Sequence, residues 1–384
     1  MEKCKLGDIC EIVSGSTPKT TIEEYWDGDV KWITPAELNE NVYIINDSVR
    51  KITKLAVEKT GLSSFPEGTV ILSTRASIGK VAIAGCEMYC NQGFKNLICS
   101  EKIFNKYLYW FLKGNTMFLN SLGRGATFKE ISKAIVSEIE INVPEIEEQH
   151  EIVKILEKVN TIIRFRKQEL SVLDTLVKAR FVEMFGDAVD NPMGWEKKQL
   201  QEIVTDDCTI SYGIVQTGND QEEGVPVFRP VDIVNRIPKL EELKRTTEEI
   251  SNKYKRTILK GHEMLITVRA NIADTCIVGK EFKGCNVGRG IVPIRTQENI
   301  MVLEFLKYLM DSKHLNDDIK SKAKGITLIQ LNMEDLREVE LIVPPIEQQK
   351  AFVEFAEQVD KSKVINQLLQ KWNYMCHVTI EKVK

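Results

Sequence analysis

The chain has 384 residues, of which 43% are hydrophobic and 28% are charged, and its formal net charge is −4. This composition is typical of a globular protein of two or three domains, and it argues against a strongly basic protein that binds nucleic acid through net charge alone. The sequence has no apolar run of about 18 residues and no apolar stretch behind Met1, so we expect a cytoplasmic protein without a membrane-spanning helix.

The first part of the chain, residues 1–142, shows the pattern of a mixed α/β unit. Short runs rich in β-branched and apolar residues occur at Val70–Leu72, Lys80–Ala84 and Asn96–Cys99, and glycines bound them. They predict strands. Residues Asn105–Leu112 follow with helical spacing, and a similar segment occurs at Leu303–Met310.

A long amphipathic segment follows the first unit. Apolar residues recur at three- and four-residue spacing from Ile146 to about Phe185, which predicts one helix. At 1.5 Å per residue this helix spans roughly 60 Å, too long to be buried in one small domain. Gly186 and Pro192 end it and begin a linker to a second unit, which extends to residue 342.

A second long helix is predicted over residues 343–384. Two long apolar faces in one chain are expected to pair, and an antiparallel coiled coil is the arrangement we predict. The fold class is therefore α/β in the mixed α+β sense. We expect two α/β domains in tandem, separated by two long helices.

The chain contains an internal repeat. Val143–Gln149 recurs as Val343–Gln349, a displacement of 343 − 143 = 200 positions. Similar pairs occur at Gly125–Thr127 and Gly325–Thr327, and at Leu72–Ile78 and Ile266–Ile272; residues 91–93 are aligned with residues 286–288, and residues 1–6 with residues 195–200. Residues 14–60 and 205–260 share little beyond hydrophobic pattern. The repeat therefore predicts two units with one scaffold and different surfaces.

Several motifs recur in a characteristic order: Leu6–Ile9, Ser14–Pro18, Gly28–Pro35, Gly68–Arg75, Asn91–Phe94 and the two Pro-x-x-x-Glu-Gln type helix openings. Their order and repetition resemble the specificity subunit of type I restriction-modification systems over essentially the whole chain. In that family each α/β unit is a target recognition domain that reads one half of a bipartite, gapped DNA sequence. The helices set the gap and dock the methyltransferase subunits.

The resemblance implies a division into four segments: residues 1–142 and 187–342 as target recognition domains, the latter with a linker at 187–195, and residues 143–186 and 343–384 as the conserved helices. It implies a non-catalytic subunit whose partners are double-stranded DNA, methyltransferase subunits and, where a system cuts DNA, restriction and translocase subunits. S-adenosylmethionine, ATP and Mg²⁺ then belong to the partner subunits, and this chain has no cofactor of its own.

Reading DNA requires polar side chains in loops, because phosphate contacts set the register and bidentate contacts to base edges identify the sequence. In the first unit the candidate residues are Ser16, Thr17, Lys19, Thr34, Arg75, Ser77, Lys80, Gln92, Arg124, Thr127 and Lys129. In the second unit they are Tyr212, Gln216, Thr217, Arg229, Arg269, Asn271, Arg289, Lys324 and Thr327.

Structural roles compete with these assignments. Any single candidate can be a turn former or a solvated charge. Arg75 and Arg269 occupy the same place in both repeats, so a DNA contact and an internal pairing with a carboxylate both remain open. Gly93 and Gly288 are interpreted as residues of tight turns.

The helix openings also have two interpretations. Pro144, Pro344 and the glutamates of the first turns fit simple helix initiation, since proline and carboxylates favour that end. The resemblance makes this region the docking surface for methyltransferase subunits. Phe165, Phe352 and Phe355 are the apolar positions that we expect to be exposed for this purpose.

Enzymatic motifs are not found. Thr74–Val81 lacks the leading glycine and the final hydroxyl residue of a P-loop, and no H-E-x-x-H metal motif occurs. Two functions therefore remain: a DNA sequence-specificity subunit, and a coiled-coil interaction scaffold whose two modules bind peptides or proteins.

Overall fold

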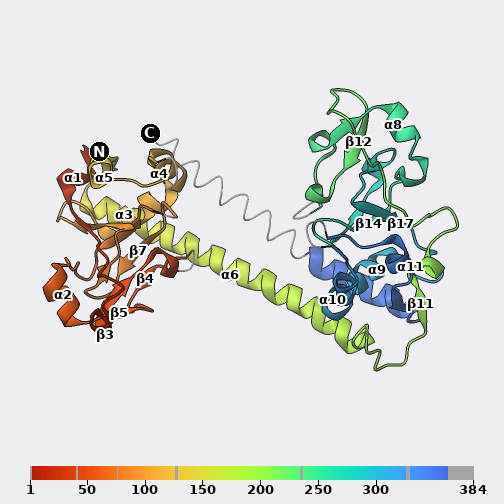
Figure 1. The fold of residues 1–384 in the computed structure, drawn as a ribbon, viewed down its shortest axis with the longest axis horizontal. Coiled ribbons are helices and arrows are strands. Elements are labelled where there is room, and N and C mark those ends of the chain that lie inside the picture. The colour runs from red at the N-terminus through yellow and green to blue at the C-terminus, as the bar shows by residue number, and fades with distance from the viewer. Residues whose placement is uncertain are drawn as a thin grey trace. The chain divides into compact units, whose positions relative to one another are not determined.

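The computed structural model describes residues 2–39, 42–75, 77–125, 129–233, 237–325 and 329–361. The chain forms two units, the first ending at Arg166 and the second beginning at Lys167. Both combine short strands and helices (Figure 1), so the predicted mixed α/β class is confirmed. None of the described helices has the length and apolar character needed to cross a membrane. Within the described chain, all cysteines are free thiols.

A five-stranded sheet forms the centre of the first unit. Its strands, in spatial order, are β2 (Cys10–Ser14), β9 (Phe94–Cys99), β6 (Val70–Ser73), β7 (Val81–Ala84) and β4 (Ile44–Ile45). Helix α3 (Asn105–Gly114) covers one face, where Leu108 and Leu112 pack with Val70. Ile71 packs on the opposite face. Strand β6 is therefore buried on both sides, which explains its uninterrupted apolar sequence.

Smaller elements complete the first unit. They are β1 (Glu2–Lys5), α1 (Leu6–Ile9), η1 (Glu23–Tyr25), β3 (Trp26–Ile33), η2 (Pro35–Glu37), β5 (Lys51–Ile52), α2 (Lys54–Thr60), β8 (Tyr89–Cys90), α4 (Thr116–Leu122), α5 (Lys133–Ser137) and β10 (Glu140–Val143). Strand β3 lies between β5 and β8, and β1 pairs with β10, the strand that precedes the long helix. The first strand of the unit thus closes onto its last.

The second unit repeats this plan with shorter sheets. A sheet of order β15 (Thr275–Val278), β14 (Glu263–Thr267), β17 (Ile291–Ile294) forms its centre, and a second has the order β13 (Lys244–Thr246), β12 (Val225–Phe228), β16 (Asn286–Val287). The remaining elements are β11 (Lys197–Gln199), α7 (Leu200–Ile203), η3 (Pro230–Asp232), η4 (Leu240–Glu242), α8 (Glu248–Asn252), η5 (Lys255–Thr257), η6 (Lys280–Phe282), α9 (Leu303–Met310), α10 (Lys313–Ser321), α11 (Met333–Arg337) and β18 (Glu340–Ile342).

Strand registers show that the two units have the same frame. Ser73 pairs with Phe94 in the first unit, as Thr267 pairs with Ile291 in the second. The parallel pairing of β3 with β8 has its counterpart in β12 with β16. The tandem repeat is confirmed. The repeat also extends into the segments 14–60 and 205–260, which contain β3 and β12. The sequences of these two segments share little, although their parallel strand pairings correspond.

The sequence alignment of residues 91–93 with 286–288 was wrong by two positions. The amide of Asn91 donates to the carbonyl of Ile33 at 3.1 Å, and the equivalent donor in the second unit is the amide of Gly288, which bonds to Phe228 at 2.8 Å. Gly290, and not Gly288, is therefore the counterpart of Gly93. The alignment had matched Asn91 with Asn286 because the two residues are identical. Strand pairing fixes the register, and it shows that their positions are not equivalent.

The long helix α6 (Ile146–Phe185) has the bounds that its apolar spacing predicted. Residues 346–361 are also helical, and the remainder of the predicted second helix lies outside the described residues. Within the second unit, Phe181 and Phe185 of α6 pack on Phe352, with ring centroids 5.4 and 5.7 Å apart. The two helices run in opposite directions there (Figure 1), as expected for antiparallel pairing.

The repeated glutamine of the two helix openings has a structural role. Gln149 is fully buried. Its side chain accepts from the amide of Phe104 at 2.8 Å and donates to the carbonyls of Lys102 and Pro144, each at 2.9 Å. Gln349 makes the same three contacts with the corresponding backbone of the second unit. Gln149 thus ties α6 to the loop before α3, and Gln349 ties the helix of residues 346–361 to the loop before α9.

Candidate nucleic-acid interface

Five loops of the first unit meet beside the central sheet, and we call them the first loop cluster: residues 14–19, 34–37, 74–80, 90–93 and 123–131. The hydroxyl of Thr17 donates to the side-chain oxygen of Gln92. The ammonium of Lys80 donates to the carbonyl of Pro35 at 3.0 Å. The amide of Thr74 donates to the carbonyl of Gly93 at 2.7 Å. These contacts bring candidates from distant parts of the sequence onto one surface.

The second loop cluster has the same construction and comprises residues 212–217, 229–232, 268–274, 287–290 and 323–331. The amide of Val268 donates to the carbonyl of Gly290 at 2.8 Å, as Thr74 does to Gly93. A Cβ added to Gly290 would lie 2.4 Å from Cγ of Pro230, and one added to Gly93 would lie 3.0 Å from Cγ of Pro35. Each glycine permits this close approach. Gly93 lies in a turn with Gln92, as the tight-turn interpretation expected, although its backbone φ is not positive.

A backbone bridge closes the last loop of each cluster. The amides and carbonyls of Arg124 and Glu130 bond reciprocally at 3.0 and 2.9 Å, and Lys324 and Gln330 do so at 2.9 and 3.0 Å. Thr127 and Thr327, two predicted contacts, lie outside the described residues.

The internal pairing with a carboxylate is present for Arg75, whereas Arg269 bonds to a neutral side-chain amide instead. Arg75 forms a backbone bridge with Glu130, and its guanidinium lies 4.0 Å from that carboxylate. Arg269 occupies the matching place and donates to the side-chain oxygen of Gln330. Both side chains are half-buried. Each arginine therefore bonds to one residue of the backbone bridge beside it, and the role of both as DNA contacts stays a prediction.

Thr34 and Arg229 are held by neighbouring carboxylates. The amide of Thr34 donates to Glu37 at 2.7 Å. Arg229 donates to Asp232 through its amide at 2.8 Å and through Nε and Nη2 at 3.0 and 2.8 Å. The hydrogen bonds to Asp232 raise the pKa of the Arg229 guanidinium. The positive charge of Arg229 is thus already paired inside the unit, which weakens its candidacy as a phosphate contact.

Most of the other candidates are exposed. Those in the first cluster are Ser16, Thr17, Lys19, Ser77, Gln92, Arg124 and Lys129; those in the second are Tyr212, Gln216, Asn271, Arg289 and Lys324. Lys80 and Thr217 are half-buried. The carbonyl of Thr217 accepts from the hydroxyl of Thr246 at 2.7 Å, so Thr217 helps to anchor its own loop.

Sequence reasoning missed the residues that shape the loops at 74–80 and 268–274. Ser73 is buried, donates to the carbonyl of Ser77 at 2.5 Å and accepts from the amide of Lys80 at 2.9 Å. Thr267 makes the same pair of contacts, donating to Asn271 and accepting from Asp274. A hydroxyl at the same place in both repeats was the available signal.

The loop clusters are basic although the chain is acidic. The first contains five basic residues, Lys19, Arg75, Lys80, Arg124 and Lys129, against two acidic ones, Glu37 and Glu130. The second contains four basic residues, Arg229, Arg269, Arg289 and Lys324, against Asp232 and Asp274. The net charge of −4 therefore does not extend to these two surfaces, and each can attract a phosphate backbone.

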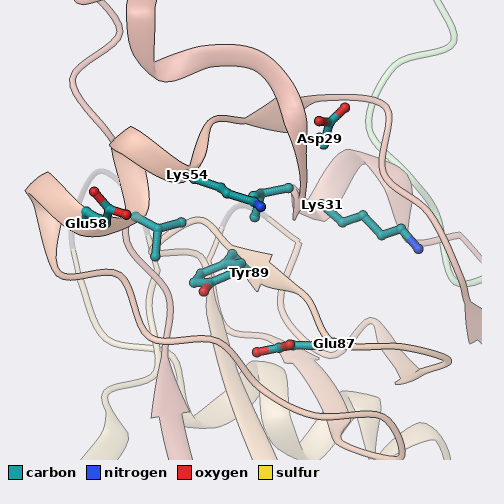
Figure 2. Close-up of a pocket in the computed structure, with 8 residues that line it drawn as sticks. Asp29, Lys31, Lys54, Glu58, Glu87 and Tyr89 are labelled. Carbon is teal, nitrogen blue, oxygen red and sulfur yellow. The ribbon is translucent and has the colours of Figure 1, made fainter.

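Other possible sites are less suitable for DNA. A hollow of about 410 Å³ lies beside β3 and α2 of the first unit (Figure 2), but its charged lining is mixed: Asp29, Lys31, Lys54, Glu58 and Glu87. In the second unit Asp187, Asp190 and His314 could together hold a metal ion. Asp187 already accepts from the amides of Val189 and Asp190 at 2.9 and 3.1 Å, which fixes the turn after α6.

The three aromatic residues proposed for partner docking have different environments. Phe165 is 57% exposed on α6. Phe352 is fully buried in the core of the second unit, and Phe355 is half-buried against that core. The expectation that Phe352 is exposed is wrong, because it lies on the face of its helix that packs against Phe181 and Phe185.

Comparison with known proteins identifies the family. The model of the type I restriction modification DNA specificity domain matches residues 1–175 and 192–371. The chain is 31% identical over 371 residues to the type I restriction enzyme MjaIX specificity subunit of Methanocaldococcus jannaschii, covering 89% of this chain and 82% of the relative. It is 24% identical to the EcoBI specificity subunit of Escherichia coli, covering 83% and 74%.

Solved structures agree on the fold. The S subunit of the type I restriction-modification system of M. genitalium matches with a TM-score of 0.56 at 15% identity, covering 98% of this chain and 94% of that one. A chain from a structure described as showing complex assembly and conformational transition of the type I R-M system matches with a TM-score of 0.59 at 19% identity, covering 100% and 95%. With both family matches spanning most of its length, this chain belongs to the family of type I restriction-modification DNA specificity subunits.

Proposed function

We propose that this chain selects the DNA target of a type I restriction-modification complex, with each loop cluster reading one half of a bipartite, gapped sequence. The chain is a non-catalytic component, so methylation and cleavage are carried out by partner subunits. In this proposal, residues 1–142 and 187–342 are the two target recognition domains. Residues 143–186 and 343–384 are the helices that set the gap.

One observation supports this proposal above the others. Two basic loop clusters are built on the same backbone contacts but display different side chains, such as Gln92 and Arg289. A repeated frame with changed side chains is what two half-sites of different sequence require, because phosphate contacts can be alike while base contacts differ. A scaffold that binds basic or neutral peptides would not need a basic surface at both places.

We further propose that the exposed apolar face of α6 docks methyltransferase subunits. Phe165 is accompanied in the first unit by Ile155 and Ile162, which are 60% and 54% exposed among the described residues. When large, exposed apolar side chains gather along one element, they often mark a surface that binds another protein. Phe355 can contribute only its exposed edge, and Phe352 is withdrawn from this set.

The test is to express the chain with the methyltransferase subunit of its own system in a host without DNA methylation, and to sequence the host genome for modified bases. A gapped, two-part methylated motif is expected. Absence of methylation from a complex shown to be folded and assembled would overturn the proposal and favour the interaction scaffold.

A further inference from the structure

One exposed residue in each loop cluster occupies the same backbone position. Residue 92 is preceded by Asn91, whose amide bonds to Ile33, and followed by Gly93, whose carbonyl accepts from Thr74. Residue 289 has the same two anchors, since Gly288 bonds to Phe228 and Gly290 accepts from Val268. Gln92 and Arg289 are therefore structural counterparts.

Both side chains project from rigid turns. Gly93, Gly288 and Gly290 are buried, whereas Gln92 and Arg289 are exposed. Each turn joins the parallel strand pair to the central sheet, so its ends are fixed by β8 and β9 in the first unit and by β16 and β17 in the second. A side chain held in this way loses little backbone entropy on binding, which is what a specific contact requires.

The two side chains are also the ones best suited to identify different bases. A glutamine amide has one acceptor and two donors and matches the edge of adenine, while an arginine guanidinium matches the two acceptors of guanine. The hydroxyl of Thr17 donates to Oε1 of Gln92, which fixes the amide orientation and leaves both amide hydrogens and a second lone pair for a base. In the second unit the backbone register places Val215 at the position of Thr17. Arg289 needs no hydroxyl donor there, because a guanidinium has no acceptor atom.

We propose that position 92 and position 289 are corresponding base-reading positions, with Gln92 identifying an adenine in one half of the target and Arg289 a guanine in the other. This inference rests on the proposed DNA-reading function and adds the base chemistry of one position in each half. The surrounding basic residues supply the phosphate contacts.

The experiment uses the assembled complex of the full chain with its methyltransferase subunit, in the methylation-free host. Genome sequencing is carried out for the wild type and for the variants Gln92→Arg and Arg289→Gln. Gln92→Arg is expected to replace one A·T position by G·C in the first half only, with a preference of about ten-fold or more. Arg289→Gln is expected to make the reverse change in the second half only.

Control variants make the same chemical changes outside the loop clusters. Gln201→Arg and Arg256→Gln alter exposed residues of the second unit, and we expect them to leave the motif unchanged. Thr17→Val removes the donor to Gln92 and should weaken discrimination about five-fold at the adenine position alone.

The outcomes separate this inference from the proposed function. A wild-type complex without a gapped motif would overturn both. A wild-type gapped motif that stays unchanged in both exchange variants would overturn only the base-reading assignment. If an exchange variant assembles but does not methylate, binding of Gln92→Ala and Arg289→Ala complexes to duplexes altered at each base decides: relaxed discrimination at one position supports the inference, and uniform loss contradicts it.

Discussion

The two units share their backbone contacts but differ in side chains both on the surface and in the core. On the surface, Thr34 and Arg229 begin equivalent turns of the two units. Gln92 and Arg289 each follow a residue whose amide bonds to the neighbouring parallel strand. In the core, Thr69, which precedes β6, corresponds to Glu263, the first residue of β14. The frame thus tolerates changes of side chain where the backbone hydrogen bonds are kept, which allows two surfaces to diverge without altering the fold.

The comparison also shows which side chains the frame cannot change. Gln149 and Gln349 make identical sets of three hydrogen bonds although their surroundings differ. These bonds satisfy backbone groups that no strand or helix can satisfy, so a residue of this length with both a donor and an acceptor is required.

The largest expected effect comes from exchanging a whole unit. Replacing residues 1–142 by the corresponding unit of another family member should change one half of the methylated motif completely and leave the other half intact, because each loop cluster is built within one unit. Sequencing the methylated host genome measures this. Replacing residues 187–342 is the reciprocal test, and alteration of both halves by either exchange would contradict independent units.

The next largest effect is on stability, and it comes from removing the buried glutamine of either unit. Gln149→Ala and Gln349→Ala each leave one buried donor and two carbonyls unsatisfied, so we expect a loss of about 4 kcal/mol in the free energy of unfolding. Urea unfolding, with hydrogen exchange to locate the unit affected, measures it. Gln348→Ala, an exposed neighbour, is the control. Equal destabilisation by the control would show that helix propensity and not the hydrogen bonds is responsible.

A third prediction concerns the core position at which the units differ. Glu263 is fully buried and accepts from Arg295 at 3.2 Å and from the amide of Gly261 at 2.9 Å. Glu263→Gln removes the fully buried carboxylate that pairs with Arg295 and leaves only the half-exposed Asp207, at 3.7 Å, as its acidic partner, so it should cost about 3 kcal/mol. Thr69 only donates to the carbonyl of Pro66 at 2.7 Å, so Thr69→Val should cost about 1 kcal/mol. Thermal unfolding of the two variants compares them, and equal losses would remove this distinction between the cores.

The smallest effect depends on pH and belongs to the first unit. Burial raises the pKa of Glu157, but hydrogen bonds from Lys106 at 2.9 Å and Tyr43 at 2.8 Å outweigh it, so this pKa lies below 4.5. A lowered folded-state pKa stabilises the protein above about pH 4.5 and loses this contribution as the pH falls through the lowered value. Because the side chain is 35% exposed, the contribution should be below about 1 kcal/mol.

Glu157→Gln should therefore flatten the dependence of unfolding free energy on pH between pH 3 and pH 5, measured by urea titration at each pH. Glu67→Gln changes an exposed carboxyl of the same unit and serves as the control. An unchanged slope in Glu157→Gln would show that the three-residue contact does not hold the carboxylate ionised.

The sequence by itself determined the tandem repeat, the start and approximate end of α6 and most of the central strands. These features follow from local periodicity, which is set by which face of each element is buried. It also placed most of the polar candidates in loops. It could not show that Arg229 is neutralised by Asp232 or that Phe352 faces the core, since both depend on neighbours that periodicity does not identify.

Only the tertiary structure decided which residues of the two repeats correspond. The shared asparagines Asn91 and Asn286 suggested one alignment of the repeats. Strand pairing instead makes Asn91 equivalent to Gly288, and Gln92 equivalent to Arg289. Tertiary structure also assembled five loops of each unit into one basic surface within an acidic chain. The physical reason is that hydrogen bonds between distant strands, and not identities along the chain, fix the register in which side chains reach a common surface.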